Sequence, residues 1–425
     1  MSPQLLAMAL APLLGLFIVS LGNGLLSSIT TLRLDAAGAS ALQIGWVSSA
    51  YFIGLALGSF FNDRLILRVG HIRAYSCFAS MIAATVLLQG LGSDISAWFV
   101  LRLINGWACV GVYLVIESWL LLASDPKSRG RVLAVYMIAL YGSGMFGQAA
   151  IGLVSGLGDS APFLIIGTLA SLSVMPVVMI PRVTPLVERV DALSPRQLLR
   201  VTPTGVMGCF GSGVAIAAVY TLLPLYLKHL GMGLGQVGQM MAWVILGAMV
   251  LQYPVGRWSD RQDRQSVLIV LCTACLVLSL VIMALPPSSL GLGAALFLLG
   301  GAIFAIYPVA VSHSADRAPA GAVVPMIQGL LLINSLGSAL SPLAVGQLMA
   351  KVGENGLFWA FALLNLVMLA YFGWCRTQRS APHAAAPFAA AAQMSPTGVE
   401  LRVTQDLQAA MDEAAGDVEA ASKAA

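Results

Sequence analysis

The chain has 425 residues, of which 59% are hydrophobic and only 9% are charged, and its formal net charge is +4 at pH 7. Because soluble domains carry about 25% charged residues, this composition excludes an ordinary soluble enzyme. The six cysteines all lie in apolar runs, which excludes a secreted protein held together by disulfides.

Apolar segments long enough to cross a membrane recur from the first residue onward. A helix needs about 20 apolar residues to cross a bilayer. In the first half, segments of this kind lie at 1–32, 36–62, 74–93, 95–124, 132–158 and 160–181. The first lacks the basic start of a signal peptide and is too long for one. The fourth is interrupted by Arg102 and Glu117.

The second half repeats this pattern. Its apolar segments lie at 201–227, 229–256, 265–312, 318–350 and 355–375. The segment 265–312 is long enough for two helices, and Pro286 and Pro287 divide it. The sequence therefore predicts an all-α polytopic membrane protein with twelve transmembrane helices.

Basic residues in the short loops predict the orientation. The loops 62–73, 124–131, 182–203, 257–265 and 313–321 together hold 14 Lys and Arg residues, whereas the loops of the other side hold three. Short loops rich in Lys and Arg remain in the cytoplasm. Both termini are therefore predicted to be cytoplasmic.

Short matches between the two halves indicate an internal repeat. The Gln-Ile-Gly at 43–45 aligns with the Gln-Val-Gly at 236–238 at an offset of 193. Two similar sets of six helices are typical of secondary transporters, whose halves rock around a central site. The predicted domains are a first bundle at 1–181, a cytoplasmic linker at 182–203 and a second bundle at 204–376. The polar, Ala-rich tail at 377–425 is predicted to be disordered or weakly helical.

The loop at 256–264 resembles the G-x-x-x-D-[RK]-x-G-[RK]-[RK] signature of the major facilitator superfamily. The matching residues are Gly256, Asp260, Arg261 and Arg264, and Asp263 stands in place of the second glycine. Four further segments look like the YcaD-type branch of bacterial transporters: 46–52, 116–118, 129–131 and 306–310. The resemblance covers residues 1 to about 376, implies a transporter with the fold of that superfamily, and names no substrate.

The signature also predicts a cytoplasmic gate. By pseudo-symmetry, Asp260 should face the start of the helix that begins after Arg131, where unpaired N–H groups create a partial positive charge. That contact requires a closed cytoplasmic side. The alternative is that Asp260 caps its own loop and pairs with Arg264. The degenerate first-half copy contributes Asp63, Arg68 and Arg73 to the predicted gate.

Ionisable side chains inside a membrane span are costly and are functional candidates by default. Arg102, Tyr113 and Glu117 fall on one helical stripe. Arg102 and Gly106 resemble a motif of the superfamily's fourth helix, whose arginine is associated with proton coupling; the alternative is a structural arginine bonded to carbonyls. Glu117 lies about 22 Å further along the helix, too far to pair with Arg102. It is predicted to pair with the basic loop 62–73, and a proton or substrate role is the alternative.

Uncharged polar and aromatic side chains at span positions are candidates to line a central cavity, although each more often joins helices together. These candidates are Asn23, Tyr51, Gln148, Trp243, Tyr307, Gln328 and Asn334. His313 and Asp316 have the spacing of a metal-binding pair but lack a third ligand. No metal and no cofactor are predicted.

Taken together, these features predict a secondary active transporter, expected to be monomeric, in a bacterial inner membrane. The sequence has no phosphate-binding G-x-x-x-x-G-K-[ST] loop, so a proton gradient is the expected energy source. Proton-coupled export of a drug-like or amphipathic metabolite is favoured, and uptake of a vitamin, sugar or organic acid is the alternative. Less favoured are a transporter-like receptor and an intramembrane enzyme, which needs clustered acid or His groups. The expected partners are the solute, protons and the bilayer, without nucleic acid.

Overall fold

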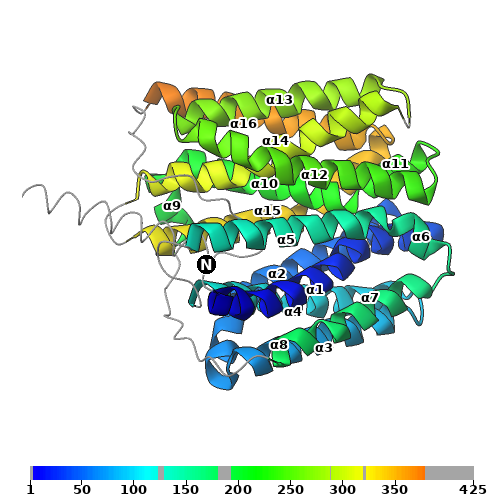
Figure 1. The fold of residues 1–425 in the computed structure, drawn as a ribbon. Helices are drawn as coiled ribbons and strands as arrows, with labels where there is room; N and C mark the ends of the chain where they lie inside the picture. The colour runs from blue at the N-terminus through cyan, green and yellow to red at the C-terminus, as the bar shows by residue number, and fades with distance from the viewer. Residues whose placement is uncertain (1–2, 123–128, 180–192, 288, 319–321, 379–425) are drawn as a thin grey trace, which may run out of the picture.

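The protein is all-helical over the part of the chain that the structure describes (Figure 1). A computed structural model describes residues 3–122, 129–179, 193–287, 289–318 and 322–378. The predicted tail at 377–425 lies outside these residues, apart from the last two residues of the final helix.

The helices of the first half form six membrane crossings. They are α1 (Pro3–Ala36), α2 (Ala41–Val69), α3 (His71–Gln89), α4 (Ile95–Leu122), α5 (Arg129–Ala149), α6 (Ile151–Ser155), α7 (Ala161–Leu172) and α8 (Val174–Val178). Only one residue separates α5 from α6, and one separates α7 from α8, so each pair continues a single crossing.

The second half repeats this arrangement after a short linker helix. Its helices are α9 (Pro195–Val201), α10 (Pro203–Thr221), α11 (Leu223–His229), α12 (Leu234–Ser259), α13 (Arg264–Ala284), α14 (Leu290–Ala315), α15 (Val323–Val352) and α16 (Gly356–Gln378). α9 is the described part of the predicted linker, and Leu193 donates a backbone hydrogen bond to the Pro325 carbonyl of α15. We call the end of the molecule that carries α9 the linker end and the opposite end, which carries α11, the far end (Figure 1).

The described residues contain twelve helical segments that are long and apolar enough to cross a membrane, which confirms the predicted number. The predicted division of 265–312 is also observed, because α13 ends at Ala284 and α14 begins at Leu290. Pro286 and Pro287 lie in the gap, where their missing N–H groups cost no helical hydrogen bond. α1 runs past the apolar segment to Ala36, so Arg33 and Asp35 stand on its last turn.

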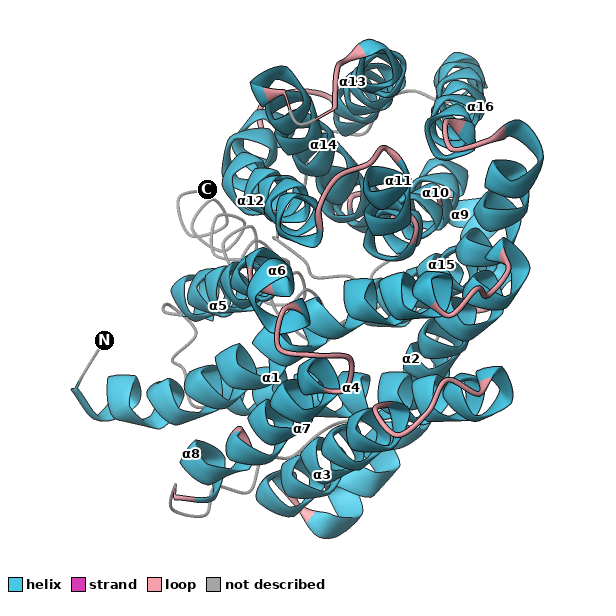
Figure 2. Ribbon diagram, turned by 90° about the vertical axis from the view of Figure 1, so that its right-hand side faces the viewer, coloured by secondary structure: helices cyan, strands magenta, loops and turns pink. Residues whose placement is uncertain are grey.

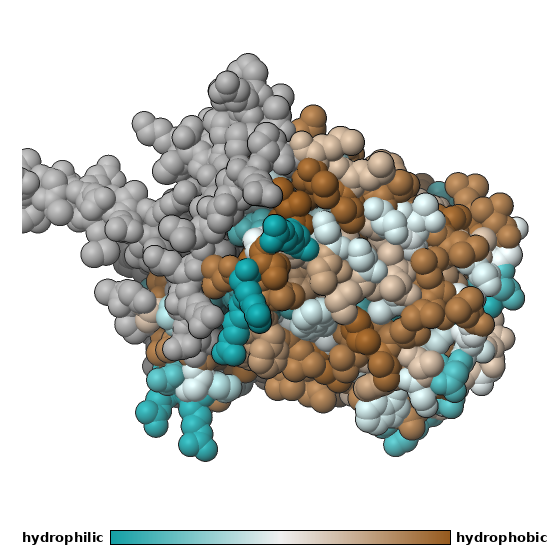
Figure 3. All heavy atoms as spheres, turned by 90° about the horizontal axis from the view of Figure 1, so that it is seen from below, coloured by the Kyte–Doolittle hydropathy of each residue, from teal (hydrophilic) through white to brown (hydrophobic). Residues whose placement is uncertain are grey.

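The outer surface is apolar around the middle of the molecule. On the face shown in Figure 3, brown hydrophobic atoms cover the central part, and teal hydrophilic atoms gather toward the two ends. Large apolar side chains are exposed on several helices. Among them are Leu153 of α6, Tyr253 of α12 and Leu363 of α16, which are 80%, 73% and 60% exposed. In water such a surface would drive aggregation, whereas in a bilayer it contacts lipid.

Each half packs mainly within itself (Figure 2). In the first half α2 packs on α4 and α1 packs on α5 and α7, and in the second half α10 packs on α14 and α15. The two halves meet along two seams, which are formed by α2 with α15 and by α5 with α12. Any site between these seams is therefore lined by both halves.

The repeated Gln-x-Gly segments begin the two seam helices at the far end. The Gln43 side chain accepts a hydrogen bond from the Ser40 backbone N–H at 2.8 Å, and Gln236 accepts one from the Gly233 N–H at 3.1 Å. Both are capping interactions of the helix start, which explain why the glutamine is repeated.

The glycine of each Gln-x-Gly segment allows the halves to touch closely. A Cβ atom at Gly45 would lie 2.8 Å from the Pro342 carbonyl oxygen of α15, and one at Gly238 would collide with the Gln148 carbonyl oxygen of α5. Only glycine leaves room for backbones at this separation. The two seams are therefore closed at the far end.

Candidate functional site

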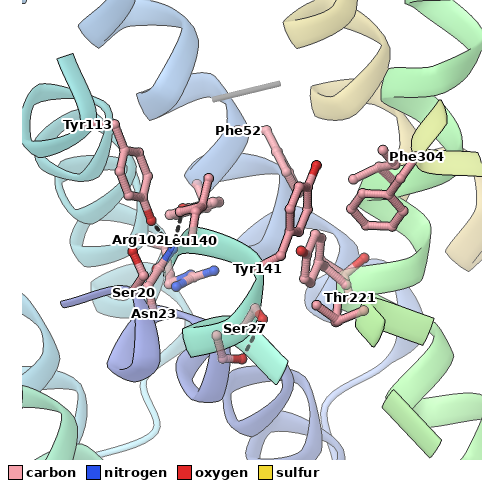
Figure 4. A pocket seen from close by; sticks show the side chains of 16 residues that line it. Ser20, Asn23, Ser27, Phe52, Arg102, Tyr113, Leu140, Tyr141, Thr221 and Phe304 are labelled. Atoms are coloured by element: carbon pink, nitrogen blue, oxygen red, sulfur yellow. Dashed lines mark hydrogen bonds between the residues drawn. The ribbon is translucent and has the colours of Figure 1, made fainter. Parts of the chain in front are cut away.

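A cavity with about 750 Å³ of empty space, its opening included, lies between the two halves (Figure 4). Its first-half wall comes from α1, α2, α4 and α5, and its second-half wall comes from α10, α12 and α14. The lining residues are Ser20, Asn23, Gly24, Ser27, Tyr51, Phe52, Arg102, Tyr113, Leu140, Tyr141, Gly144, Ile216, Tyr220, Thr221, Ile245 and Phe304.

The first-half wall is polar and cross-linked by Asn23. The Asn23 amide donates hydrogen bonds to the Tyr51 hydroxyl at 3.0 Å and to the Tyr113 hydroxyl at 3.1 Å. Its carbonyl oxygen lies 3.6 Å from the Cys109 sulfur, which donates to it. One side chain thus joins α1, α2 and α4 at the cavity wall. Tyr113 and Cys109, which lie four residues apart on α4, supply two of these contacts.

Arg102 is the charged residue of this wall. Its side chain is only 2% exposed, and its guanidinium carbon lies 4.4 Å from the centroid of the Tyr51 ring, in a cation–π contact. Neither Nε nor Nη1 has a hydrogen-bond partner, and no described carboxylate lies within ion-pair distance. Figure 4 shows it on the same side of the cavity as Tyr113, Ser20 and Asn23.

The side of the cavity that faces Arg102, formed by Tyr141 of α5 together with the second-half residues, is aromatic and uncharged. The Phe304 ring packs edge-on against Tyr220 at 5.8 Å and against Tyr141 at 5.9 Å, measured between ring centroids. Ile216 and Ile245 complete this apolar surface. Tyr141 also accepts a hydrogen bond from Gln252 of α12 at 3.2 Å, which joins the halves beside the cavity. The cavity is therefore polar and cationic on one side and aromatic on the other.

Several predicted cavity residues do not line this cavity, which corrects their assignment. Gln148 is fully buried between α1 and α5, where it accepts from Ser28 at 2.8 Å and donates to the Gly24 carbonyl at 2.7 Å. Trp243 packs against Phe297. Tyr307 is 1% exposed inside α14. Gln328 lies on α15 outside the lining.

Asn334 lies outside the main cavity but on the wall of a second pocket. It lines a smaller pocket between α2 and α15, while its amide donates to the Cys209 carbonyl at 3.0 Å. Of the seven predicted cavity residues, Asn23 and Tyr51 thus lie on the wall of the main cavity. The reason is that a polar side chain on a membrane helix either faces a cavity or satisfies a neighbouring backbone, and the sequence does not distinguish the two.

Glu117 lies near the linker end of α4 and is 3% exposed. Arg64, Arg68 and Arg73 are exposed, and the pairing of Glu117 with the segment 62–73 stays a prediction. The predicted loop 62–73 is helical except at Gly70, which has a φ of 86° and separates α2 from α3.

The second-half signature forms a buried ion pair at the linker end. Arg264 is 3% exposed, and its Nε lies 3.0 Å from the Asp316 carboxylate at the end of α14. Asp260 is further from Arg264, at 3.7 Å, and is 37% exposed. Asp263 replaces a glycine of the signature because it caps α13, accepting from the Ser266 N–H at 3.1 Å. The sequence did not identify Asp316 as the main partner of Arg264.

The remaining gate residues lie in the two copies of the signature. Gly256 accepts the backbone hydrogen bond of Asp260 at 3.0 Å, and Arg261 is exposed. In the first-half copy, Asp63 is half-buried. The proposed contact of Asp260 with the start of α5 involves residues 123–128 and the side chains of 129–131, which lie outside the described parts of the structure.

A cluster of charged side chains holds the two halves together at the far end. Asp35 of α1 lies 2.9 Å from Lys228 Nζ and 3.1 Å from His229 Nε2, both of α11. The other ring nitrogen of His229, Nδ1, lies 2.8 Å from Glu354. Burial lowers the pKa of His229, but the two carboxylates outweigh it, so the pKa is raised above 6.5. We call Asp35, Lys228, His229 and Glu354 the far-end clasp.

The described residues contain no group of three or more His, Cys, Asp or Glu side chains that could hold a metal ion. His313 is buried within α14, and Asp316 instead pairs with Arg264. The arrangement is therefore suited to binding a solute by hydrogen bonds, charge and aromatic contacts.

Known proteins are similar to this chain in sequence or in fold. A family model described as Major Facilitator Superfamily matches residues 13–330. Proteins named "Uncharacterized MFS-type transporter YcaD" from Salmonella arizonae and Salmonella enteritidis are each 32% identical over 358 residues, which is 84% of this chain and 93% of theirs. The crystal structure of the nucleoside transporter NupG has a TM-score of 0.70 at 14% identity, covering 86% of this chain and 98% of that one. A D-xylose-proton symporter has a TM-score of 0.67 at 13% identity, covering 87% and 96%.

Proposed function

This chain belongs to the Major Facilitator Superfamily and is a multi-pass membrane transporter rather than an enzyme, and from this premise we propose that it exports a small amphipathic organic solute in exchange for protons. The observation that carries the proposal is the cavity between the halves, with a polar wall facing an aromatic one. Such a site accommodates a solute that has a polar end and an apolar body.

The proposed mechanism is alternating access. We place the boundaries of the moving units at 1–181 and 204–376, joined by the linker 182–203. The far end is held shut by the clasp and by the close contact at Gly45. With the linker end in the cytoplasm of a bacterial inner membrane, as its basic loops suggest, this is a state closed to the outside. Export requires these contacts to break and equivalent contacts to form at the linker end.

Export is favoured over uptake because the large aromatic wall suits an amphipathic solute better than a strongly hydrated nutrient. Uptake of a vitamin, sugar or organic acid is the alternative direction. Proton exchange is the proposed energy source, and a monomer is the proposed unit, because the cavity is complete within one chain.

Transport in reconstituted vesicles tests this function. Purified protein in proteoliposomes should exchange a labelled solute for the unlabelled one, because only a carrier shows such counterflow. In inside-out membrane vesicles, an imposed proton gradient with an acidic interior should drive solute into the vesicles. Accumulation in right-side-out vesicles instead would establish uptake. Absence of counterflow with every solute that binds the protein would contradict the proposed function.

A further inference from the structure

We propose that Arg102 binds a carboxylate group of the transported solute, and that the substrates are organic monoanions with an aromatic or other apolar body. This inference rests on the proposed function of the cavity and names the chemical class of solute that the cavity accepts. Three observations support it. Arg102 has no counter-charge among the described residues, the other buried arginine, Arg264, has one, and Arg102 is the single charge among the residues that line the cavity.

The first argument is the missing counter-charge. A guanidinium is always protonated in proteins, so Arg102 brings a full positive charge to a position that is 2% exposed. A buried charge is costly unless it is paired and hydrogen-bonded. Two of its nitrogens, Nε and Nη1, have no hydrogen-bond partner, and its cation–π contact with Tyr51 supplies no hydrogen-bond acceptor.

The second argument is a comparison within the protein. Arg264 is as deeply buried as Arg102, and it lies 3.0 Å from the carboxylate of Asp316. A buried arginine with a structural role is thus given a partner by the fold. Arg102 has none among the described residues, although it lines the cavity between the two halves. The unfilled partner position therefore belongs to a ligand.

The third argument is the number and placement of charges. Arg102 is the only charged residue among the sixteen that line the cavity. One cation matches one anionic group, whereas a dianion would leave a second charge buried without compensation and a cation would be repelled. A planar carboxylate suits the flat guanidinium fork. The aromatic wall around Phe304 then receives the rest of the molecule.

Binding of matched probes tests the inference. The panel consists of aromatic monocarboxylates, among them 4-phenylbutyrate and 1-naphthylacetate, each with its primary amide and the corresponding primary amine. The melting temperature of the full-length purified protein in detergent is measured against the concentration of each probe, because a ligand of the folded state raises it. We expect the carboxylates to bind at least tenfold more tightly than their amides, and the amines to bind least.

Two substitutions assign this preference to Arg102. Arg102→Gln should abolish the preference for carboxylate over amide while leaving amide binding within about twofold, because the amide does not need the charge. Arg102→Lys keeps the charge and loses the planar fork, so it should retain part of the preference. Thr168→Ala, which changes an exposed side chain of α7 outside the cavity lining, is the control and should leave the preference intact.

The melting temperature without ligand separates a binding role from a structural one. If Arg102 binds solute, Arg102→Gln removes an unpaired buried charge, and the empty protein should be at least as stable as the original. If Arg102 instead holds α4 in place, the variant should melt at a clearly lower temperature. That result, or a carboxylate preference that persists in Arg102→Gln, would overturn the inference.

The inference and the proposed function fail in different ways. Tighter binding of amides or amines than of carboxylates, with counterflow intact, would refute the monoanion class and leave the transporter function standing. The same holds if no carboxylate of the panel binds while a neutral or cationic solute does. Absence of counterflow for a carboxylate that binds through Arg102 would instead refute the proposed function and leave the binding site standing.

Discussion

At the scale of single residues, the protein treats its buried charges in two ways. Arg264 forms an ion pair with Asp316 at the linker end, whereas Arg102 lines the cavity with no described carboxylate within ion-pair distance. The Arg264 pair is structural, because both partners are about 3% exposed and join α13 to α14. Removing one partner of such a pair leaves the other charge stranded, which costs more than the pair itself contributes.

Asp316→Asn should therefore destabilise the protein markedly. We expect a loss of about 3–5 kcal/mol, the usual cost of stranding a buried charge, measured as a large fall in melting temperature in detergent. Asp159→Asn is the control, because Asp159 is 80% exposed and forms a surface ion pair with Arg33. Its loss should be about 0–1 kcal/mol, as for exposed pairs. Equal effects of the two substitutions would contradict a structural role for the pair of Asp316 with Arg264.

Asn23 is a second residue with a large expected effect, because its side chain joins three helices. Asn23→Ala removes two donated hydrogen bonds, to Tyr51 and Tyr113, and should cost about 1–3 kcal/mol. Binding of the solute should weaken as well, because Tyr51 positions Arg102 through its ring. The melting temperature and the binding curve report the two effects separately. Unchanged binding would show that the network is not needed to shape the site.

At the scale of helices, close contact between α2 and α15 closes the far end. Gly45 permits this contact, because a Cβ atom there would lie 2.8 Å from the backbone oxygen of Pro342. Backbone atoms cannot rotate away as a side chain can, so an added methyl group must separate the two helices. The closed state of the far end is thus sensitive to one atom.

Gly45→Ala should shift the population toward a state open at the far end. Overpacking of about 1–3 kcal/mol corresponds to a change of about 5- to 150-fold in the ratio of the two states. Distances between spin labels at Leu42 and Val352, both exposed, report this end of the seam. Gly142→Ala is the control, because a Cβ atom at Gly142 meets nothing within 4 Å. If both variants give the distance distribution of the unmodified protein, the seam does not control closure.

At the scale of the whole molecule, the far-end clasp makes closure depend on pH. The clasp joins α1 to α11, and His229 is flanked by Asp35 and Glu354, with Lys228 beside it. Hydrogen bonds from both ring nitrogens to carboxylates require the protonated form of His229. Its pKa is therefore above 6.5 when the far end is closed and returns toward 6.5 when the carboxylates move away.

Acid on the far-end side should accordingly favour the closed state. Because the raised pKa belongs to the closed state, the stabilisation is fully present below pH 6.5 and is lost as the pH rises through the raised value. The Leu42–Val352 spin-label distance should show more open protein at pH 9 than at pH 6. His229→Gln does not titrate and should show a weaker dependence on pH. An equal dependence in this variant would assign the effect to another group.

The orientation of the molecule is a second property at this scale. The linker end carries the start of α1 and the end of α16, together with the described basic segments 62–73 and 257–265 (Figure 1). Green fluorescent protein fused after Gln378 should fluoresce, because it folds in the cytoplasm, and alkaline phosphatase fused there should be inactive. Fusions after Lys228 should show the reverse. The opposite pattern would place the clasp in the cytoplasm and reverse the proposed sidedness.

Much of the fold followed from the sequence because it depends on local properties. Twelve apolar segments of membrane-spanning length, the break at Pro286 and Pro287, and the repeated Gln-x-Gly starts are visible in the chain itself. Every backbone polar group in a bilayer must be satisfied internally, so apolar segments of that length have to be helices. The charged residues of α4 were conspicuous for the same reason, since charge is rare in such segments.

The roles of the polar side chains were decided only by the tertiary structure. Asn23 and Gln148 look alike in the sequence, yet one lines the cavity and the other bonds to the Gly24 carbonyl inside a bundle. Asp35 and His229, 194 positions apart, meet only because α1 and α11 converge at the far end. Whether Arg102 has a partner depends on what surrounds it in space. Pairing, burial and cavity lining are relations between helices, and helical periodicity specifies only which face of one helix a residue occupies.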